Sequence, residues 1–147
     1  MENVEAALFK KGGLTEALGI YVVRLGSSDA VTALTVGRHH LQHHGLIHAG
    51  TCATLADHTA GAAASTRILG HQAVLTAEFK VNLLKPASGD QLWCRAEVLR
   101  AGKQLHVVES RVYVGVPDDL AQSTMVAVAL VTLAVVDAPK DQDEAAS

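Results

Sequence analysis

Apolar and polar side chains alternate most clearly in the second half of the chain. The alternation runs through residues 92–98 and returns at residues 108–114. A two-residue period places successive side chains on opposite faces, so these stretches predict half-buried strands. Met125 to Val136 is almost continuously apolar, which is typical of a strand that is covered on both faces or that uses one face for association. Four strands are expected in this half, at about residues 71–84, 90–101, 104–116 and 122–137.

The chain before these strands predicts a short helix and a hairpin. Residues 3–17 have the apolar spacing of a short amphipathic helix that is broken by a glycine pair. Ile20–Leu25 and Ala30–Val36 have the composition of strands. The residues between them, Gly26 to Asp29, are of the types that form tight turns, so the two strands are expected to pair as a hairpin.

One long helix is expected between the hairpin and the later strands. Gly50 to Leu69 contains no proline, and four of its side chains share one helical face: Leu55, Thr59, Ala62 and Thr66. Arg67 stands near the predicted C-terminal end, where a positive charge interacts favourably with the helix dipole. Gly70 is the expected stop.

This order of elements predicts an α+β fold. With so few helices, the economical arrangement is an antiparallel sheet of about six strands wrapped around a single central helix. A chain of 147 residues forms one domain, expected over residues 1–138, with a polar, acidic and disordered tail over residues 139–147. One face of such a sheet stays uncovered, so a dimer is expected.

The composition narrows the range of partners and compartments. The chain is 49% hydrophobic and 18% charged, which favours association between copies. Its twelve Lys and Arg residues are scattered without a basic stripe, which argues against nucleic acid. No apolar run reaches the roughly 18 residues of a spanning helix, and the N-terminal segment is too polar for a secretory signal. We therefore expect a soluble, cytoplasmic protein without a membrane partner, whose two cysteines, Cys52 and Cys94, are reduced.

A single carboxylate, Asp57, stands inside a long run of small apolar residues, a position in which it is expected to be buried. Burying it without a partner would cost several kcal/mol, at the order of magnitude. Its neighbours three and four residues away on a helix are all small: Ala53, Thr54, Ala60 and Gly61. A ligand or a partner backbone can therefore approach the acid closely. Asp57 is either a core acid bonded to a neighbouring group or a catalytic residue.

His48 and the start of the helix offer a second set of polar groups. The backbone amides of Ala49, Gly50 and Thr51 lack partners in a first helical turn and favour negative charge, as in an oxyanion hole or at any ordinary helix start. Nine residues separate His48 from Asp57, which on a helix is about 13.5 Å and a rotation of about 900°. The two side chains would point in opposite directions. If both serve one reaction centre, they come from two copies related by symmetry.

The same segment resembles a known family. The pattern combines Gln42 and Gly45 with His48-Ala49-Gly50, Leu55-Ala56-Asp57 and Gly61-x-Ala63. It is similar to the signature of the hotdog-fold thioesterases of the phenylacetate-pathway type, which include the 4-hydroxybenzoyl-CoA thioesterases. A weaker similarity extends to Asn82-Leu83-Leu84-Lys85-Pro86 and to Arg100-x-Gly102-Lys103. The resemblance implies a homodimer or homotetramer that hydrolyses an acyl-CoA thioester at the subunit interface, with no cofactor beyond the CoA of its substrate.

The resemblance also implies roles for individual residues. Asp57 would act as general base toward water or as nucleophile. The amide of Ala49, followed by Gly50, would polarise the thioester carbonyl. His48 would fix that loop, and Gln42 would contact the thioester or the attacking water.

This chain departs from the family pattern at two positions and matches it at a third. Ala49 stands where the commoner motif has glycine, although its amide remains. Gly61 stands where some relatives have threonine, so no hydroxyl is present there. Thr76 matches a serine or threonine that other relatives use. These differences are expected to affect which substrate is used more than which reaction is catalysed.

Other interpretations of these residues remain open. Five histidines between positions 39 and 48 invite a metal site, but their spacing matches no metal motif, and we expect solvated or locally bonded rings and no metal. Cys52 is either a nucleophile or a small core residue. A hotdog dehydratase acting on hydroxyacyl thioesters and a non-catalytic acyl-CoA binding or sensing protein are alternative functions.

Three cations flank predicted strand ends where a nucleotide could lie: Lys85, Arg100 and Lys103. We expect them near the CoA phosphates, and solvated surface charge is the alternative interpretation.

Overall fold

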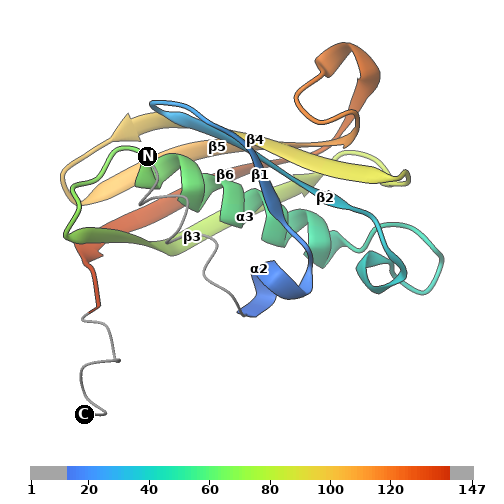
Figure 1. Cartoon of the computed structure of the whole chain (residues 1–147), viewed down its shortest axis with the longest axis horizontal. Helices are drawn as coiled ribbons and strands as arrows, with labels where there is room; N and C mark the ends of the chain where they lie inside the picture. Colours follow the sequence, from blue (N-terminus) through green and yellow to red (C-terminus); the bar gives the residue numbers. More distant parts are fainter. Residues whose placement is uncertain (1–12, 140–147) are drawn as a thin grey trace.

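Six antiparallel strands wrap around one long helix in the computed structural model, which describes residues 13–139 (Figure 1). In sheet order the strands are β1 (Tyr21–Leu25), β2 (Asp29–Thr35), β4 (Gln91–Ala101), β5 (Leu105–Gly115), β6 (Ser123–Asp137) and β3 (Gln72–Leu83). The helices are α2 (Gly13–Ala17), α3 (Ala49–Ser65) and two 3₁₀ turns, η1 (Arg38–His40) and η2 (Leu120–Gln122). Each strand pairs antiparallel with its neighbours. The predicted α+β class, with a six-stranded sheet around a central helix, is confirmed.

The predicted hairpin and the four later strands are present, and the predicted end of the long helix is wrong. The amide of Gly26 donates to the Asp29 carbonyl at 2.8 Å and closes the β1–β2 turn. Helix α3 ends at Ser65 rather than Leu69. The hydroxyls of Ser65 and Thr66 donate back to helix carbonyls at 2.7 Å each, and such local bonds compete with further helix. Gly70 is therefore not the stop.

Two expectations concern residues at the ends of the chain. Of the short helix predicted over residues 3–17, only Gly13–Ala17 falls within the described residues, where it is helical. The tail predicted over residues 139–147 lies outside the described residues except for Pro139. Within residues 13–139, no helix is long and apolar enough to cross a membrane.

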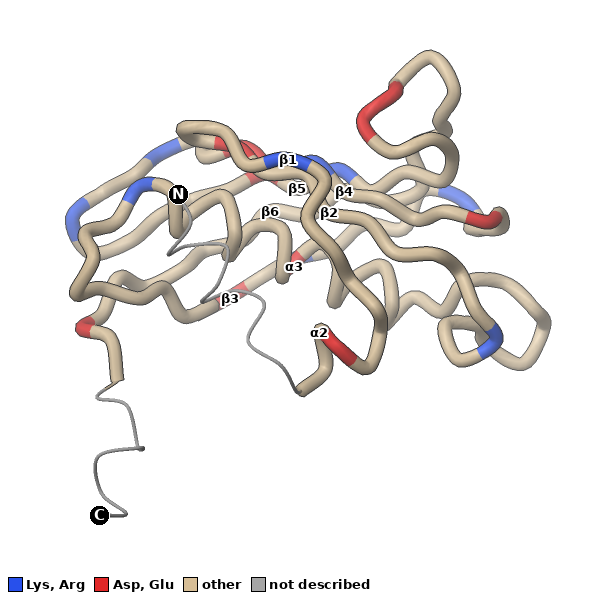
Figure 2. Tube along the Cα trace, viewed as in Figure 1, with Lys and Arg blue, Asp and Glu red and all other residues tan. Residues whose placement is uncertain are grey.

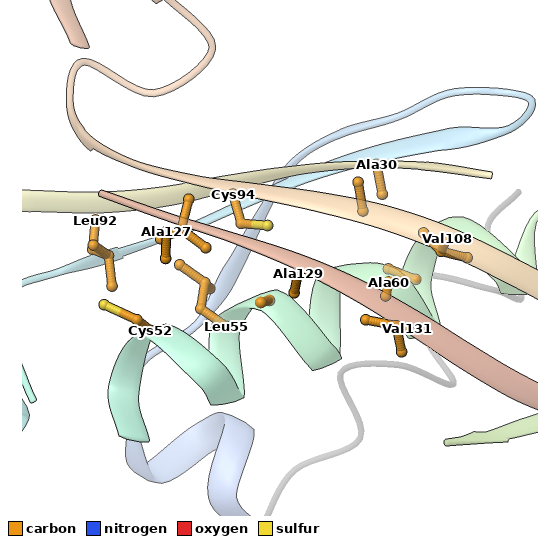
Figure 3. Packing of buried hydrophobic residues seen from close by; sticks show 14 of the residues in the cluster. Ala30, Cys52, Leu55, Ala60, Leu92, Cys94, Val108, Ala127, Ala129 and Val131 are labelled. Atoms are coloured by element: carbon orange, nitrogen blue, oxygen red, sulfur yellow. The ribbon is translucent and has the colours of Figure 1, made fainter. Parts of the chain in front are cut away.

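Small side chains on α3 pack into the sheet. Figure 3 shows Cys52, Leu55 and Ala60 of the helix against residues of β4, β5 and β6. Both cysteines are buried free thiols, and burial raises the pKa of Cys52 to about 11 and that of Cys94 to about 12. Because the thiolate is the nucleophile, Cys52 does not have the ionisation of a reactive cysteine. The alternative of a small core residue is favoured.

His106 of β5 packs beneath the C-terminal end of α3. The residue is 2% exposed, and its Nδ1 has no hydrogen-bond partner among the described residues. Burial lowers the pKa of its imidazole below the ordinary value of 6.5, with the Ala64 backbone acting in the opposite direction. The folded state therefore takes up this proton less readily than the unfolded chain does.

A dependence of stability on pH follows from His106. The stability that the neutral His106 contributes to the fold is fully present above about pH 6.5 and is lost as the pH falls through the lowered pKa. We expect the urea midpoint of unfolding to be lower at about pH 5 than at about pH 7.5, and the difference to shrink in His106→Leu. Equal pH dependence in the two proteins would contradict this role of His106.

Candidate functional site

The loop before α3 is held in place by histidine side chains. His40 is buried, its Nδ1 accepts from the Gly37 amide at 2.8 Å, and its Nε2 bonds the Leu18 carbonyl at 2.8 Å. Its own carbonyl accepts from the His48 amide at 2.9 Å. The sequence missed this anchoring role, because nothing in a run of histidines distinguishes the buried ring. Gly45 turns the loop with φ +81°, a conformation that glycine adopts without strain.

His48 caps the helix and accepts hydrogen bonds from two of the three amides that were predicted to be free. Its Nδ1 accepts a hydrogen bond from the Gly50 amide at 2.8 Å, and its carbonyl accepts from the Thr51 amide at 2.9 Å. The amide of Ala49 has no acceptor among the described residues, and Ala49 is exposed. The expectation of three free amides is therefore wrong, and the first turn presents one, that of Ala49.

Ala49 lines a pocket of about 530 Å³. The walls come from the loop before α3, the first turn of α3, the end of β3 with the following loop, and β6. The lining residues are Gln42, Leu46, Ile47, His48, Ala49, Cys52, Leu83, Leu84, Lys85, Pro86, Ala87 and Val126. The side-chain oxygen of Gln42 accepts from the His44 amide, which orients Gln42 at this pocket. Most of the apolar lining was missed from the sequence, because it comes from segments far apart in the chain.

Asp57 lies on a partly uncovered face of α3 rather than in the core. Its carboxylate accepts a hydrogen bond from the Thr76 hydroxyl at 2.6 Å, so the structure brings these two predicted residues together. Thr76 pairs across the sheet with buried Leu133, which places its side chain on the helix side of β3. A Cβ added at Gly61 would meet no atom of the described residues within 4 Å. The expectation that this chain buries Asp57 is wrong, because the small residues around the acid leave open space beside it.

Two buried hydrogen bonds hold the central turn of α3, which carries Asp57. The Ser110 hydroxyl donates to the Ala56 carbonyl at 2.8 Å, and the Thr32 and Thr59 hydroxyls are 2.7 Å apart. These buried bonds fix the helix against β2 and β5 at the turn that carries the acid.

Burial lowers the pKa of the His58 imidazole next to Asp57, and the negative charge of Asp57 opposes this effect.

The predicted site residues form two groups within one chain. Gln42, His48 and Ala49 line the pocket, whereas Asp57 and Thr76 do not. Ala49 and Asp57 are eight residues apart on a continuous helix, which is about 12 Å along the axis. A reacting atom must lie within about 3 Å of both groups, so one chain does not complete this site.

The predicted CoA-binding cations are also divided. Lys85 lines the pocket at the N-terminal end of α3. Arg100 is near the end of β4 and Lys103 is in the β4–β5 turn, which lies toward the other end of that helix (Figures 1 and 2). A helix of 17 residues is about 25 Å long, so these groups do not meet within one chain.

Histidines and acids do not gather into a metal site in the described part of the chain. No group of three or more His, Cys, Asp or Glu residues is placed to hold an ion there. The rings of His39 and His40 and those of His43 and His44 contact each other in pairs, with centroids 3.9 and 4.0 Å apart.

Comparisons with known proteins agree with this fold. Residues 44–121 match the family model described as the thioesterase superfamily. A thioesterase family protein from Silicibacter pomeroyi is 30% identical, with a TM-score of 0.85 over 93% of this chain and 98% of that chain. A thioesterase from Haemophilus influenzae (19% identical, TM-score 0.80, 95% and 92% covered) and the Escherichia coli PaaI protein from the phenylacetic acid degradation operon (24%, 0.76, 92% and 94%) share the fold. No curated protein gives a significant match.

Proposed function

We propose that this chain, which belongs to the thioesterase superfamily, hydrolyses an acyl-CoA thioester to the free acid and CoA. The family predicted from the segment around His48 and Asp57 is confirmed by the match over residues 44–121. The observation that carries the proposal is the pair of half-sites: a free Ala49 amide at a pocket, and an Asp57 carboxylate that Thr76 orients beside open space.

In the proposed reaction, the two half-sites act on opposite sides of one carbonyl. The Ala49 amide donates a hydrogen bond to the thioester oxygen and stabilises the negative charge that develops on it, an effect typically worth about 3–4 kcal/mol. Asp57 takes a proton from the water that attacks the carbonyl carbon, or attacks that carbon itself. The C–S bond then breaks and CoA leaves as the thiolate. Where Asp57 is the nucleophile, water then hydrolyses the anhydride between the acyl group and Asp57, which releases the free acid and restores the carboxylate. Gln42 and His48 hold the loop and the thioester in position.

A second copy would bring the two half-sites together. Strand β3 is at the edge of the sheet, is 12 residues long and exposes Leu75, Phe79 and Leu83. A long apolar edge strand is a surface on which another strand adds. Antiparallel pairing of two β3 edges about a two-fold axis runs the two α3 helices in opposite directions. Asp57 of one subunit then faces the Ala49 end of the other, which supports a homodimer with a shared site.

The same dimer determines which subunit can supply each cation that is proposed to contact CoA. Lys85 is the proposed partner for a CoA phosphate from the subunit that supplies Ala49, because it lines that pocket. Arg100 and Lys103 would reach this end only from the other subunit.

A thiol-release assay on acetyl-, hexanoyl- and phenylacetyl-CoA tests the proposed reaction. We expect turnover on at least one thioester, with free acid and CoA in equal amounts. Tight binding without turnover of any thioester would refute hydrolysis and support the binding protein. Loss of water from a hydroxyacyl thioester with its C–S bond intact would support the dehydratase.

Replacement of Thr76 by valine is expected to lower kcat by roughly 10- to 100-fold with little change in KM. The substitution keeps the shape of the side chain and removes the hydroxyl that donates to Asp57 at 2.6 Å, so the carboxylate loses its orientation. The steady-state kinetics of Thr124→Val, which changes an exposed threonine on β6, provide the matched control. Equal kcat values in the two variants would show that Thr76 does not position Asp57.

A further inference from the structure

The pocket beside Ala49 has an apolar floor. Four of its lining residues are buried, with exposures of 5% for Ile47, 2% for Cys52, 6% for Ala87 and 2% for Val126. The one polar atom that these side chains contribute is the Cys52 sulfur. We infer that this pocket binds the acyl part of the substrate and selects acyl groups that are hydrocarbon at their distal end, an inference that rests on the proposed thioester hydrolysis.

The polar lining of the pocket lies toward its mouth. His48 and Lys85 are exposed and Gln42 is half-buried, whereas the floor residues are almost fully covered. When the thioester oxygen is bound by the Ala49 amide, the thioester group therefore lies among the polar side chains at the mouth of the pocket. Its acyl chain extends past Leu46 and Leu83 toward the buried floor.

The size of the pocket favours acyl groups longer than acetyl. A volume of 530 Å³ corresponds to about 18 water molecules at roughly 30 Å³ each. An acetyl group leaves most of that water in place, whereas a longer chain displaces it from apolar walls. Each added methylene is expected to raise kcat/KM roughly fourfold until the pocket is filled.

The floor discriminates against polar distal groups because its side chains offer them no hydrogen-bond partner stronger than the Cys52 thiol. A hydroxyl that enters loses its hydrogen bonds to water, which is expected to lower kcat/KM by roughly 10- to 100-fold. A distal carboxylate is excluded more strongly, since an ionised group has no counter-charge among the floor residues.

Matched pairs of substrates test this selectivity. In each pair we expect kcat/KM to be about tenfold or more higher for the substrate without the distal polar group. The pairs are hexanoyl-CoA with 6-hydroxyhexanoyl-CoA, phenylacetyl-CoA with 4-hydroxyphenylacetyl-CoA, and butanoyl-CoA with succinyl-CoA. Hydroxylated or carboxylated substrates that react as fast as their parents would overturn the inference.

Variants of the floor locate the selectivity in this pocket. Val126→Phe fills the floor and is expected to lower the ratio of hexanoyl-CoA to acetyl-CoA kcat/KM by roughly tenfold. Ala87→Leu is a smaller insertion that makes the same test if Val126→Phe does not fold. Val128→Phe, on the outer face of the same strand, is the matched control and should leave the ratio unchanged. An unchanged ratio in folded Val126→Phe and Ala87→Leu would overturn the assignment.

Binding measurements separate this inference from the proposed function. Calorimetric titration of Asp57→Asn with hexanoyl-CoA and 6-hydroxyhexanoyl-CoA measures the selectivity of the pocket without turnover. Tighter binding of hexanoyl-CoA by roughly tenfold supports the pocket assignment even if no thioester is cleaved. Equal affinities overturn it even if hydrolysis is demonstrated.

Discussion

Replacement of Asp57 by asparagine is expected to reduce kcat for thioester hydrolysis by about 10²- to 10⁴-fold, the range observed for loss of a general base. The amide has the size and shape of the carboxylate, and its oxygen can still accept the hydrogen bond that Thr76 donates at 2.6 Å. It has neither the basicity to take a proton from water nor the charge to act as a nucleophile. KM should change little, because Asp57 does not line the pocket that is proposed to bind the acyl group.

The Asp57→Asn experiment needs evidence that the variant is folded. Circular dichroism and the sedimentation coefficient should match those of the wild-type protein, since the acid is not part of the apolar core. Turnover within about threefold of wild type in a folded variant would remove Asp57 from the reaction, because loss of a general base has a far larger effect.

Ala49→Pro is expected to lower kcat by about 10²- to 10³-fold, because it deletes the backbone N–H that is proposed to stabilise the oxyanion. The position tolerates proline unusually well. Ala49 is the first residue of α3, where proline is favoured, and His48 before it has φ −62° and ψ 139°, the extended conformation that proline requires of its neighbour. The lost N–H has no acceptor among the described residues, so the fold loses no hydrogen bond.

Ala49→Ser is the matched control, because it changes the side chain at the same place and keeps the N–H. Its kcat should stay within a few-fold of wild type, as the residue is exposed. If the serine and proline variants lose activity equally, the effect belongs to the side chain and the Ala49 amide is not the oxyanion donor.

Much of the fold could be predicted from the sequence because its signals are local. The two-residue alternation over residues 92–98 and 108–114 marks strands β4 and β5, and the turn residues from Gly26 mark the hairpin. The helix end was mispredicted for an equally local reason. Ser65 and Thr66 bond back to the helix through their hydroxyls, and nothing in their identity distinguishes that geometry from a solvent-facing side chain.

The candidate site was only partly predictable, because it depends on which surfaces meet. A run of small residues around Asp57 indicates burial, yet among the described residues Asp57 is only half-buried. The sequence predicts three free amides at the helix start, but the ring and the carbonyl of His48 accept hydrogen bonds from two of them. The pocket floor joins Ile47, Ala87 and Val126 from three separate segments, which no local pattern could bring together.

Subunit complementation tests the shared site most directly. Asp57→Asn and Ala49→Pro subunits are each expected to lose most of their activity as homodimers, but in the proposed dimer a mixed pair contains one site with both groups intact. When equal amounts of the two variants are unfolded and refolded together, half of the dimers are mixed and about a quarter of the wild-type rate should return. A mixture no more active than the two variants measured separately would contradict the shared site.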